Sequence, residues 1–279
     1  MYEILSREDL APVTKLFEVR APTVARKARA GHFVIVRIDE EGERVPLTIA
    51  DSDRERGTIT LVFQEVGKTT MQMGTMQPGD QFASCTGPLG LPSEIERYGT
   101  VLLVGGGVGI APIYPIAREL KEAGNTVLSV IGARNQDLLF WEDKMRTVSD
   151  ELTVCTDDGS YGRKALVTIP TKEMLEAGRP IEHIWAIGPA IMMKFCALTT
   201  RPFGVPTTVS LNSIMVDGTG MCGACRVEVG GRTRFVCVDG PEFDGHQVDW
   251  DQLLARQRIY LEQEKQATET WKHQCQCGS

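Results

Sequence analysis

A buried strand, a glycine-rich loop, a helix and a second buried strand follow one another near the middle of the chain, and this unit constrains the fold most. Residues 100–104 form an apolar run, residues 105–112 form the loop, residues 113–123 have a helical pattern, and residues 127–131 are apolar again. Continuous apolar strands joined through a helix are typical of a parallel sheet. The loop would place backbone N–H groups and a helix N-terminus beside a pyrophosphate. The unit therefore predicts a nucleotide-binding α/β domain.

The loop departs from the usual dinucleotide fingerprint at two points. Ile110 occupies the third glycine position of G-x-G-x-x-G, and Arg134 follows the second strand in the region where an acidic residue is usual. Arg134 could contact a ribose or a 2′-phosphate, so the sequence leaves the choice between NADH and NADPH open. A glycine-rich turn without a ligand is the alternative interpretation.

The first 97 residues have a different pattern. Short apolar or alternating runs, such as residues 14–19, 32–38 and 58–63, are separated by turn residues. Many short strands at this spacing indicate a small antiparallel barrel. A barrel with long loops would offer a groove for a flavin.

Two segments of this barrel suit an anionic flavin cofactor. In the first, Arg44 could neutralise a pyrophosphate, Pro46 fixes the backbone, and Thr48 could hydrogen-bond the flavin ring or its ribityl chain. In the second, residues 67–70 combine a glycine, a lysine, two hydroxyls and backbone N–H groups, which suit a phosphate. The first segment alone could equally be a solvated strand end. The two segments together favour a cofactor that carries phosphate groups.

A cysteine-containing loop indicates a metal centre. Asp217, Cys222, Cys225 and Cys237 have the spacing D-x4-C-x2-C-x11-C. Plant-type [2Fe-2S] proteins have C-x4-C-x2-C and a distant fourth cysteine, so Asp217 stands where the first cysteine would be. A carboxylate is anionic like a thiolate but is a harder donor, so the potential and lability of such a cluster should differ from those of an all-cysteine cluster. Zinc is the rival metal, although this ligand set would be unusual for zinc. Unligated cysteines are the third alternative.

The residues after this loop predict a hairpin and then a helix. Two strand-like segments flank Gly230-Gly231, and their pairing would bring Cys225 and Cys237 to one end. Residues 249–272 are mostly helix-forming and carry several apolar side chains. This helix either packs on its own barrel or docks a partner.

Cys275 and Cys277 form a C-x-C pair next to the C-terminus. A pair without other ligands nearby is more typical of a frayed tail than of a metal site. Their role stays open.

Composition excludes several functions. The net charge of −7 argues against a nucleic-acid partner. No apolar run approaches the roughly 18 residues of a membrane-spanning helix, and the N-terminus has no secretory-signal pattern. Clustered cysteines without such a signal favour metal ligation in a reducing compartment. We therefore expect a cytoplasmic protein with no membrane contact.

Several motifs together resemble one family along nearly the whole chain. The cluster loop and the following V-D-G-P-E-F-D-G-H, within residues 211–246, resemble the small FAD- and [2Fe-2S]-containing subunit of NADH-dependent reduced ferredoxin:NADP oxidoreductase. G-G-x-G-[IV]-[AT]-P is matched from Gly106 to Pro112, T-D-D-G-S-x-G from residue 156, and G-P-x-x-M-M from residue 188. The electron-transfer subunit of type B dihydroorotate dehydrogenase is a more distant resemblance, with four cysteine ligands.

The resemblance implies a fold and a division into domains. We expect a β-barrel flavin domain plus an α/β nucleotide-binding domain, ferredoxin reductase-like, with a small C-terminal iron-sulfur module. The antiparallel barrel that binds FAD would span residues 1–97, the NAD(H)-binding domain residues 98–206, and the [2Fe-2S] module residues 207–248. Residues 249–279 would form a C-terminal helix and tail.

The resemblance also implies a set of site residues. The expected cofactor-binding residues are Arg44, Pro46, Leu47, Thr48, Gly67, Lys68, Thr69, Thr70, Gly106, Gly107, Val108, Gly109, Ala111, Pro112, Arg134, Asp157, Asp158, Gly188, Pro189 and Met192. The expected cluster ligands are Asp217, Cys222, Cys225 and Cys237. No side chain is expected to act as a general acid or base, because hydride transfer takes place at FAD and the protein's main task is positioning.

The implied function is electron transfer. The chain would exchange hydride between NAD(H) and FAD and pass single electrons through the cluster to a larger NADP(H)- and ferredoxin-reacting flavoprotein, in an electron-bifurcating heterodimer or higher assembly. The enzyme alternative is the electron-transfer subunit of dihydroorotate dehydrogenase or of a hydrogenase, and Asp217 disfavours the former. The non-enzyme alternative is a zinc-stapled binding module. Redox potentials, the direction of electron flow and the partner's identity stay open.

Overall fold

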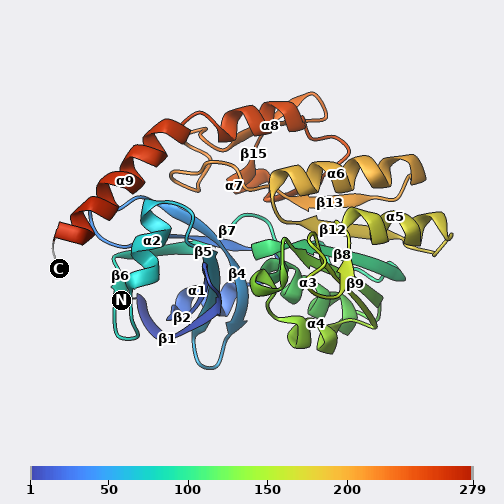
Figure 1. Cartoon of the computed structure of the whole chain (residues 1–279), viewed down its shortest axis with the longest axis horizontal. Coiled ribbons are helices and arrows are strands. Elements are labelled where there is room, and N and C mark those ends of the chain that lie inside the picture. Colours follow the sequence, from blue (N-terminus) through green and yellow to red (C-terminus); the bar gives the residue numbers. More distant parts are fainter. Residues whose placement is uncertain (1, 278–279) are drawn as a thin grey trace.

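The computed structural model describes residues 2–277, with side chains as far as residue 273. Two seven-stranded sheets lie side by side, and a small C-terminal part lies over both (Figure 1). None of the described helices is both long and apolar enough to cross a membrane.

The first sheet is the expected antiparallel barrel. Its strands have the order β6-β1-β2-β5-β4-β3-β7, and every pair in it is antiparallel. Alternate residues point inward, and the rings of Phe17 and Phe63 pack in the interior with centroids 5.0 Å apart. The strands are β1 (Tyr2–Ala11), β2 (Thr14–Arg20), β3 (Phe33–Arg37), β4 (Val45–Asp53), β5 (Thr58–Gln64), β6 (Gln81–Phe82) and β7 (Ser84–Leu89).

The second sheet is the expected α/β domain, and its strands have the order β11-β10-β9-β8-β12-β13-β16. Its strands are β8 (Thr100–Gly106), β9 (Thr126–Ala133), β10 (Glu151–Thr156), β11 (Arg163–Lys164), β12 (His183–Ile187), β13 (Thr207–Ser210) and β16 (Glu242–Asp244). All pairs are parallel except β13 with β16.

Helices cover both faces of this sheet because β8 is apolar on both sides. Val101 and Leu103 pack in the cluster formed with α3 (Ile110–Glu122) and α4 (Glu142–Val148). Leu102 and Val104 pack in the cluster formed with α5 (Thr168–Glu176) and α6 (Ala190–Thr200). The remaining α-helices are α1 (Pro22–Lys27), α2 (Lys68–Thr75), α7 (Val236–Asp239), α8 (Trp250–Gln257) and α9 (Leu261–Cys277).

The sheet of the nucleotide domain continues beyond residue 206, where the motif-based division begins a new module. β13 and β16 flank the cluster loop in sequence and complete the edge of that sheet. The hydrophobic core is also continuous, because Val209, Cys225 and Cys237 belong to one buried cluster with Met193 of α6. The cluster module is therefore built onto the nucleotide domain.

The expected hairpin and C-terminal helix are present with two differences. β14 (Arg226–Val229) and β15 (Arg232–Phe235) pair around Gly230 and Gly231, which both have positive φ. Cys237 lies in α7 instead of on the strand, because the Asp239 carboxylate accepts the Phe235 N–H (2.7 Å) and turns the chain.

The expected single helix is broken at residues 258–260 into α8 and α9. Figure 1 shows α9 crossing from α8 to α2 on the barrel. The side chains of Cys275 and Cys277 lie outside the described residues, so the expectation of a frayed tail is untested.

Candidate functional site

A cavity of about 240 Å³ lies where the barrel, the nucleotide domain and the cluster module meet. Each part contributes to its wall. The lining residues that the argument uses are Pro46 and Thr48 from the barrel, Gly109 and Gly188 from the nucleotide-domain loops, and Ser213 and Met215 from the segment before the cluster loop.

Strand alternation decides which barrel residues reach this cavity. Pro46 and Thr48 are two positions apart on β4 and both line it. Leu47, between them, points into the barrel core and is 9% exposed. We expected Leu47 to bind the cofactor, but its side chain does not line this cavity.

Close approach of two loops forms the opposite wall. A Cβ atom on Gly109 would lie 2.1 Å from the carbonyl oxygen of Ile187, so no side chain fits there. Val108 and Pro112 also line this cavity. Ala111 lies in the first turn of α3 and is buried in the core, and of the glycine-loop residues predicted to bind a cofactor it is the one that lines no cavity described here.

Ser213 provides a test of whether a flavin ring fits this cavity. Its hydroxyl is buried, and no hydrogen-bond partner exists for it among the described residues. A buried orphan hydroxyl costs about 1–3 kcal/mol, whereas a polar ligand edge would satisfy it. A mostly apolar wall with a buried, unpartnered hydroxyl therefore suits a flat, polar-edged ring.

A second cavity, of about 630 Å³, lies at the N-terminus of α2. It collects the four expected phosphate-binding residues and one face of α9: Gly67, Lys68, Thr69 and Thr70, with Leu261, Lys265, Thr268 and Lys272. An added Cβ on Gly67 would meet nothing within 4 Å, so the backbone there is open to a ligand. Helix N-termini and lysines both favour a phosphate at this place.

The strand β4 connects the two cavities. Val45 lines the second cavity, and Pro46 and Thr48 line the first, so the two cavities follow one another along this strand. This arrangement suits an extended dinucleotide with its ring in one cavity and its phosphates in the other. Arg44 is exposed directly before β4 and forms no ion pair in the described part of the chain.

Two hydroxyls of the expected phosphate site already form hydrogen bonds within the protein. Thr70 Oγ1 accepts hydrogen bonds from the N–H groups of Val66 and Gly67, both at 3.0 Å. Thr69 Oγ1 donates to the Glu43 carboxylate. Lys68 and the backbone N–H groups are thus the donors best placed for a phosphate.

A third cavity, of about 610 Å³, lies at the carboxyl ends of the parallel strands, where α/β sheets bind nucleotides. It collects the expected residues Gly106, Gly107, Arg134, Asp157, Pro189 and Met192. Burial and the neighbouring Asp158 carboxylate raise the pKa of Asp157 above its ordinary value. Asp158 itself turns away, because its carboxylate accepts the N–H and hydroxyl of Ser160, which lowers its pKa.

Sequence reasoning missed several cavity residues. Ser213 and Met215 follow β13, and their position just beyond the carboxyl end of a parallel strand was the available signal. Ile191 and Phe195 in the third cavity lie on α6 one turn apart and are 49% and 53% exposed. No sequence pattern in α9 indicated that one face of this helix would line the second cavity.

The structure brings two of the four expected cluster ligands together. Cys225 and Cys237 are buried with their sulfur atoms 3.2 Å apart. Sulfur ligands of one tetrahedral metal lie about 3.8 Å apart, given metal–sulfur bonds of about 2.3 Å. Burial and the adjacent Cys225 raise the pKa of the Cys237 thiol to about 12, so a metal would have to displace its proton.

The other two expected ligands lie on the same loop but do not complete a site. Cys222 is exposed, and the carboxylate of Asp217 accepts the N–H groups of Thr219 (2.9 Å) and Cys222 (3.0 Å). These bonds hold the pKa of Asp217 below its ordinary value. No group of three or more acidic, histidine or cysteine side chains is arranged for a metal among the described residues. The expected four-ligand set therefore stays a prediction.

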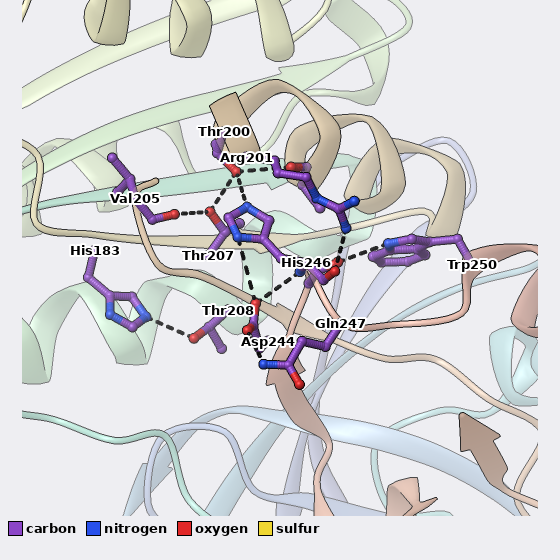
Figure 2. Close-up of polar contacts among 12 residues, drawn as sticks. His183, Thr200, Arg201, Val205, Thr207, Thr208, Asp244, His246, Gln247 and Trp250 are labelled. Atoms are coloured by element: carbon purple, nitrogen blue, oxygen red, sulfur yellow. Dashed lines mark hydrogen bonds and ion pairs between the residues drawn. The ribbon is translucent and has the colours of Figure 1, made fainter. Parts of the chain in front are cut away.

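A network of hydrogen bonds connects the cluster module to the nucleotide domain (Figure 2). His246 Nε2 lies 2.9 Å from the hydroxyl of Thr200 at the end of α6, and Thr207 donates to that same hydroxyl (2.7 Å). Arg201 donates to the carbonyl oxygen of His246. Burial lowers the pKa of His246, so its ring stays neutral near pH 7. The module is thereby fixed at a defined position beside the sheet.

Two family models match this chain. Residues 103–197 match the oxidoreductase NAD-binding domain, and residues 212–249 match the iron-sulfur cluster binding domain of dihydroorotate dehydrogenase B. A Thermotoga maritima protein called a homolog of the dihydroorotate dehydrogenase B (NAD(+)) electron transfer subunit is 54% identical over 94% of this chain and 93% of its own length. The corresponding subunit of Geobacillus thermodenitrificans is 33% identical over 88% of this chain and 96% of its own length.

The chain belongs to this family of electron transfer subunits. A solved structure of NADH-dependent reduced ferredoxin-NADP oxidoreductase, studied for flavin-based electron bifurcation, is 52% identical with a TM-score of 0.92, covering 97% of this chain and 98% of that one. Phthalate dioxygenase reductase is 19% identical with a TM-score of 0.59, covers 82% of this chain and 85% of that one, and shares the fold.

These matches confirm the expected resemblance and fold class. The chain is an oxidoreductase subunit, and FAD, a [2Fe-2S] cluster and NAD(H) are confirmed as the cofactor set at the level of the family. The relatives are named as subunits, which supports a larger partner.

Proposed function

We propose that this chain is the electron-transfer subunit of an electron-bifurcating, NADH-dependent ferredoxin:NADP oxidoreductase. It exchanges hydride between NAD(H) and FAD and passes single electrons through a [2Fe-2S] cluster to a larger NADP(H)- and ferredoxin-reacting flavoprotein. The observation that carries the proposal is the cavity at which the barrel, the nucleotide loops and the cluster module meet. One ring there would contact all three parts.

In this proposal the chain's residues hold FAD along β4. Thr48 and Ser213 contact the ring, while Arg44, Lys68 and the N–H groups at the start of α2 hold the phosphates. When bound, FAD would supply the step between two-electron and one-electron chemistry.

NAD(H) takes the third cavity, with its pyrophosphate at Gly106 and Gly107. Arg134 and Asp157 line the same cavity, and they would contact a ribose. Gly109 and Gly188 leave room for the nicotinamide to approach the central cavity, which is the first cavity, between the barrel, the nucleotide domain and the cluster module. The protein contributes position, because no proton-transferring side chain is needed.

The cluster is held by Asp217, Cys222, Cys225 and Cys237 in this proposal. The buried pair of sulfur atoms forms its inner side. Cys222 and Asp217, on the exposed loop, close the outer side. The cluster then faces the surface through which a partner flavoprotein receives electrons.

The second candidate is the electron-transfer subunit of a dihydroorotate dehydrogenase. The family model for residues 212–249 and the names of several relatives favour it. Asp217 in the place of a cysteine favours the ferredoxin:NADP enzyme instead. The large subunit that copurifies with this chain from its own cells separates the two candidates.

An anaerobic titration of the purified chain tests the proposal. NADH should bleach the flavin absorption first and then the cluster absorption, and NADPH should do so far less effectively. Zinc has no such absorption, so a colourless protein that binds zinc would support a zinc-stapled module and overturn the proposal.

A further inference from the structure

Glu242 is a half-buried acid that the proposed function does not use, and it lies where three parts of the molecule meet. It is on β16, five residues after Cys237. Its carboxyl group accepts hydrogen bonds from the Ser93 hydroxyl (2.5 Å) and from Trp185 Nε1 (3.3 Å). Ser93 belongs to the linker between the barrel and the nucleotide domain, and Trp185 to β12.

The same linker is tied to the barrel and to the segment before β16. The Ser93 N–H donates to the Ala30 carbonyl (2.8 Å), and the Leu91 N–H donates to the Gly240 carbonyl (2.6 Å). A Cβ atom on Gly31 would lie 2.5 Å from Ser93 Oγ and 3.2 Å from Glu242 Oε1. The barrel backbone therefore lies directly against the Ser93–Glu242 bond.

The carboxyl group is also titratable in this place. Burial raises the pKa of Glu242 to about 7 from an ordinary 4.5, against the opposing effect of its two hydrogen bonds. Part of its side chain faces a cavity of about 380 Å³, which gives protons a route. The titratable and charged groups around it are Glu94, Glu96 and Tyr98 from the linker, His183 from β12 and Asp244 from β16.

Of these groups, His183 stays neutral because burial lowers its pKa to about 4. Its Nε2 lies 2.8 Å from the Thr208 hydroxyl (Figure 2). No ion pair to Glu242 is formed in the described part of the chain. Ionisation of Glu242 is therefore unfavourable, because no neighbouring cation compensates for the loss of solvation of the carboxylate.

We propose that Glu242 is the positioning residue that fixes the cluster module against the barrel and the nucleotide domain, and thereby sets the separation of flavin and cluster. The inference rests on the proposed function. The Glu242 carboxyl group accepts one hydrogen bond from the linker and one from the sheet of the nucleotide domain. Only four residues separate it from Cys237 in the sequence. Ionisation above about pH 7 places an uncompensated charge at this junction and loosens it.

The test compares wild-type protein with Glu242→Ala, Glu242→Gln and the matched control Glu94→Gln. Glu94 lines the same cavity, is exposed, and makes no side-chain bond to Ser93 or Trp185. Protein containing FAD and cluster is mixed anaerobically with NADH, and cluster bleaching is followed between pH 6 and pH 9. FAD and iron contents are measured in each sample.

We expect Glu242→Ala to slow cluster reduction about tenfold or more, with FAD and iron contents unchanged, because a small misplacement is costly. Glu242→Gln can keep both contacts, because its carbonyl oxygen can accept the Trp185 Nε1–H and its NH2 group can donate to the Ser93 hydroxyl. It should therefore match wild type at pH 6 and lose the change in rate near pH 7. Ser93→Ala should slow the reaction as well, and it serves if Glu242→Ala does not fold. A wild-type rate in Glu242→Ala, or an effect of Glu94→Gln equal to that of Glu242→Gln, overturns the proposal.

Two measurements on the same proteins do not depend on electron transfer. Since the folded pKa lies above the ordinary value, wild type should lose stability relative to Glu242→Gln between about pH 4.5 and about pH 7, and no further above that. Limited proteolysis should cut residues 90–99 faster in Glu242→Ala than in Glu94→Gln. If wild-type cluster is not reduced by NADH, the proposed function fails, and equal cleavage of the two variants separately overturns the role of Glu242.

Discussion

Asp217 has two roles to separate at the residue scale. Its carboxylate accepts two backbone N–H groups of its own loop, so it shapes the turn whether or not it binds a metal. A carboxylate has about four lone-pair sites, so it can keep both bonds and still ligate iron.

We expect Asp217→Ala to lose or destabilise the cluster while FAD content stays unchanged. Asp217→Cys removes the loop bonds but restores an anionic ligand, so it should keep a cluster with a changed potential. Iron content and the EPR spectrum of the reduced protein measure both outcomes. An intact, unshifted cluster signal in Asp217→Ala would falsify the ligand role.

Ser213→Ala should stabilise the cofactor-free protein and weaken its binding of FAD. Without FAD, Ser213→Ala removes a buried orphan hydroxyl and should raise the free energy of unfolding by about 1 kcal/mol. With FAD, it removes a hydrogen bond and should weaken FAD binding by roughly fivefold, or about 1 kcal/mol. Denaturant unfolding and FAD titration measure the two effects, with Ser210→Ala, on the same cavity wall, as the control. Equal changes in both states would exclude a contact with the ring.

At the scale of elements, α9 lies on its own barrel and forms one wall of the second cavity. Leu261, Lys265, Thr268 and Lys272 are spaced by three or four residues, so one face of the helix meets the start of α2. This agrees with packing on the barrel and leaves the opposite face exposed.

Removal of residues 261–279 should therefore weaken FAD binding by about tenfold or more, equivalent to about 1.4 kcal/mol. The shortened protein loses the cover and two lysines beside the expected phosphates. FAD content after dialysis is the measurement. Removal of residues 274–279 alone is the control and should retain FAD. Full FAD retention without α9 would place the phosphates elsewhere.

At the scale of the whole molecule, the cavities lead from the carboxyl ends of the parallel strands to the segment before the cluster loop. Cys222 and Met221 are exposed on that loop, and Met221 is 88% exposed. An exposed apolar side chain beside the expected cluster suits contact with a partner.

The chain alone should therefore reduce artificial dyes with NADH but should not reduce ferredoxin with NADPH. Dye and ferredoxin absorbance under anaerobic conditions measure the two activities. Addition of the large subunit is the control that should restore the second activity. Stoichiometric, NADPH-driven ferredoxin reduction by the isolated chain would contradict this division of labour.

The sequence by itself determined the two sheets and the order of the cofactor motifs. Strand alternation and the continuous apolar run of residues 100–104 are local patterns, and so is the cysteine spacing around Cys222. These patterns predict the fold because the alternation of side chains along a strand and the turns that glycine permits depend only on a few neighbouring residues.

Only the tertiary structure decided which distant residues meet. β16 joins the edge of the nucleotide sheet, Ser213 reaches the central cavity, α9 returns to α2, and Glu242 meets Ser93 across 149 positions. None of these contacts follows from local spacing, because each depends on how buried surfaces of separate elements pack together. The same packing shields the Glu242 carboxyl group from water, and this loss of solvation, which no sequence pattern displays, raises its pKa.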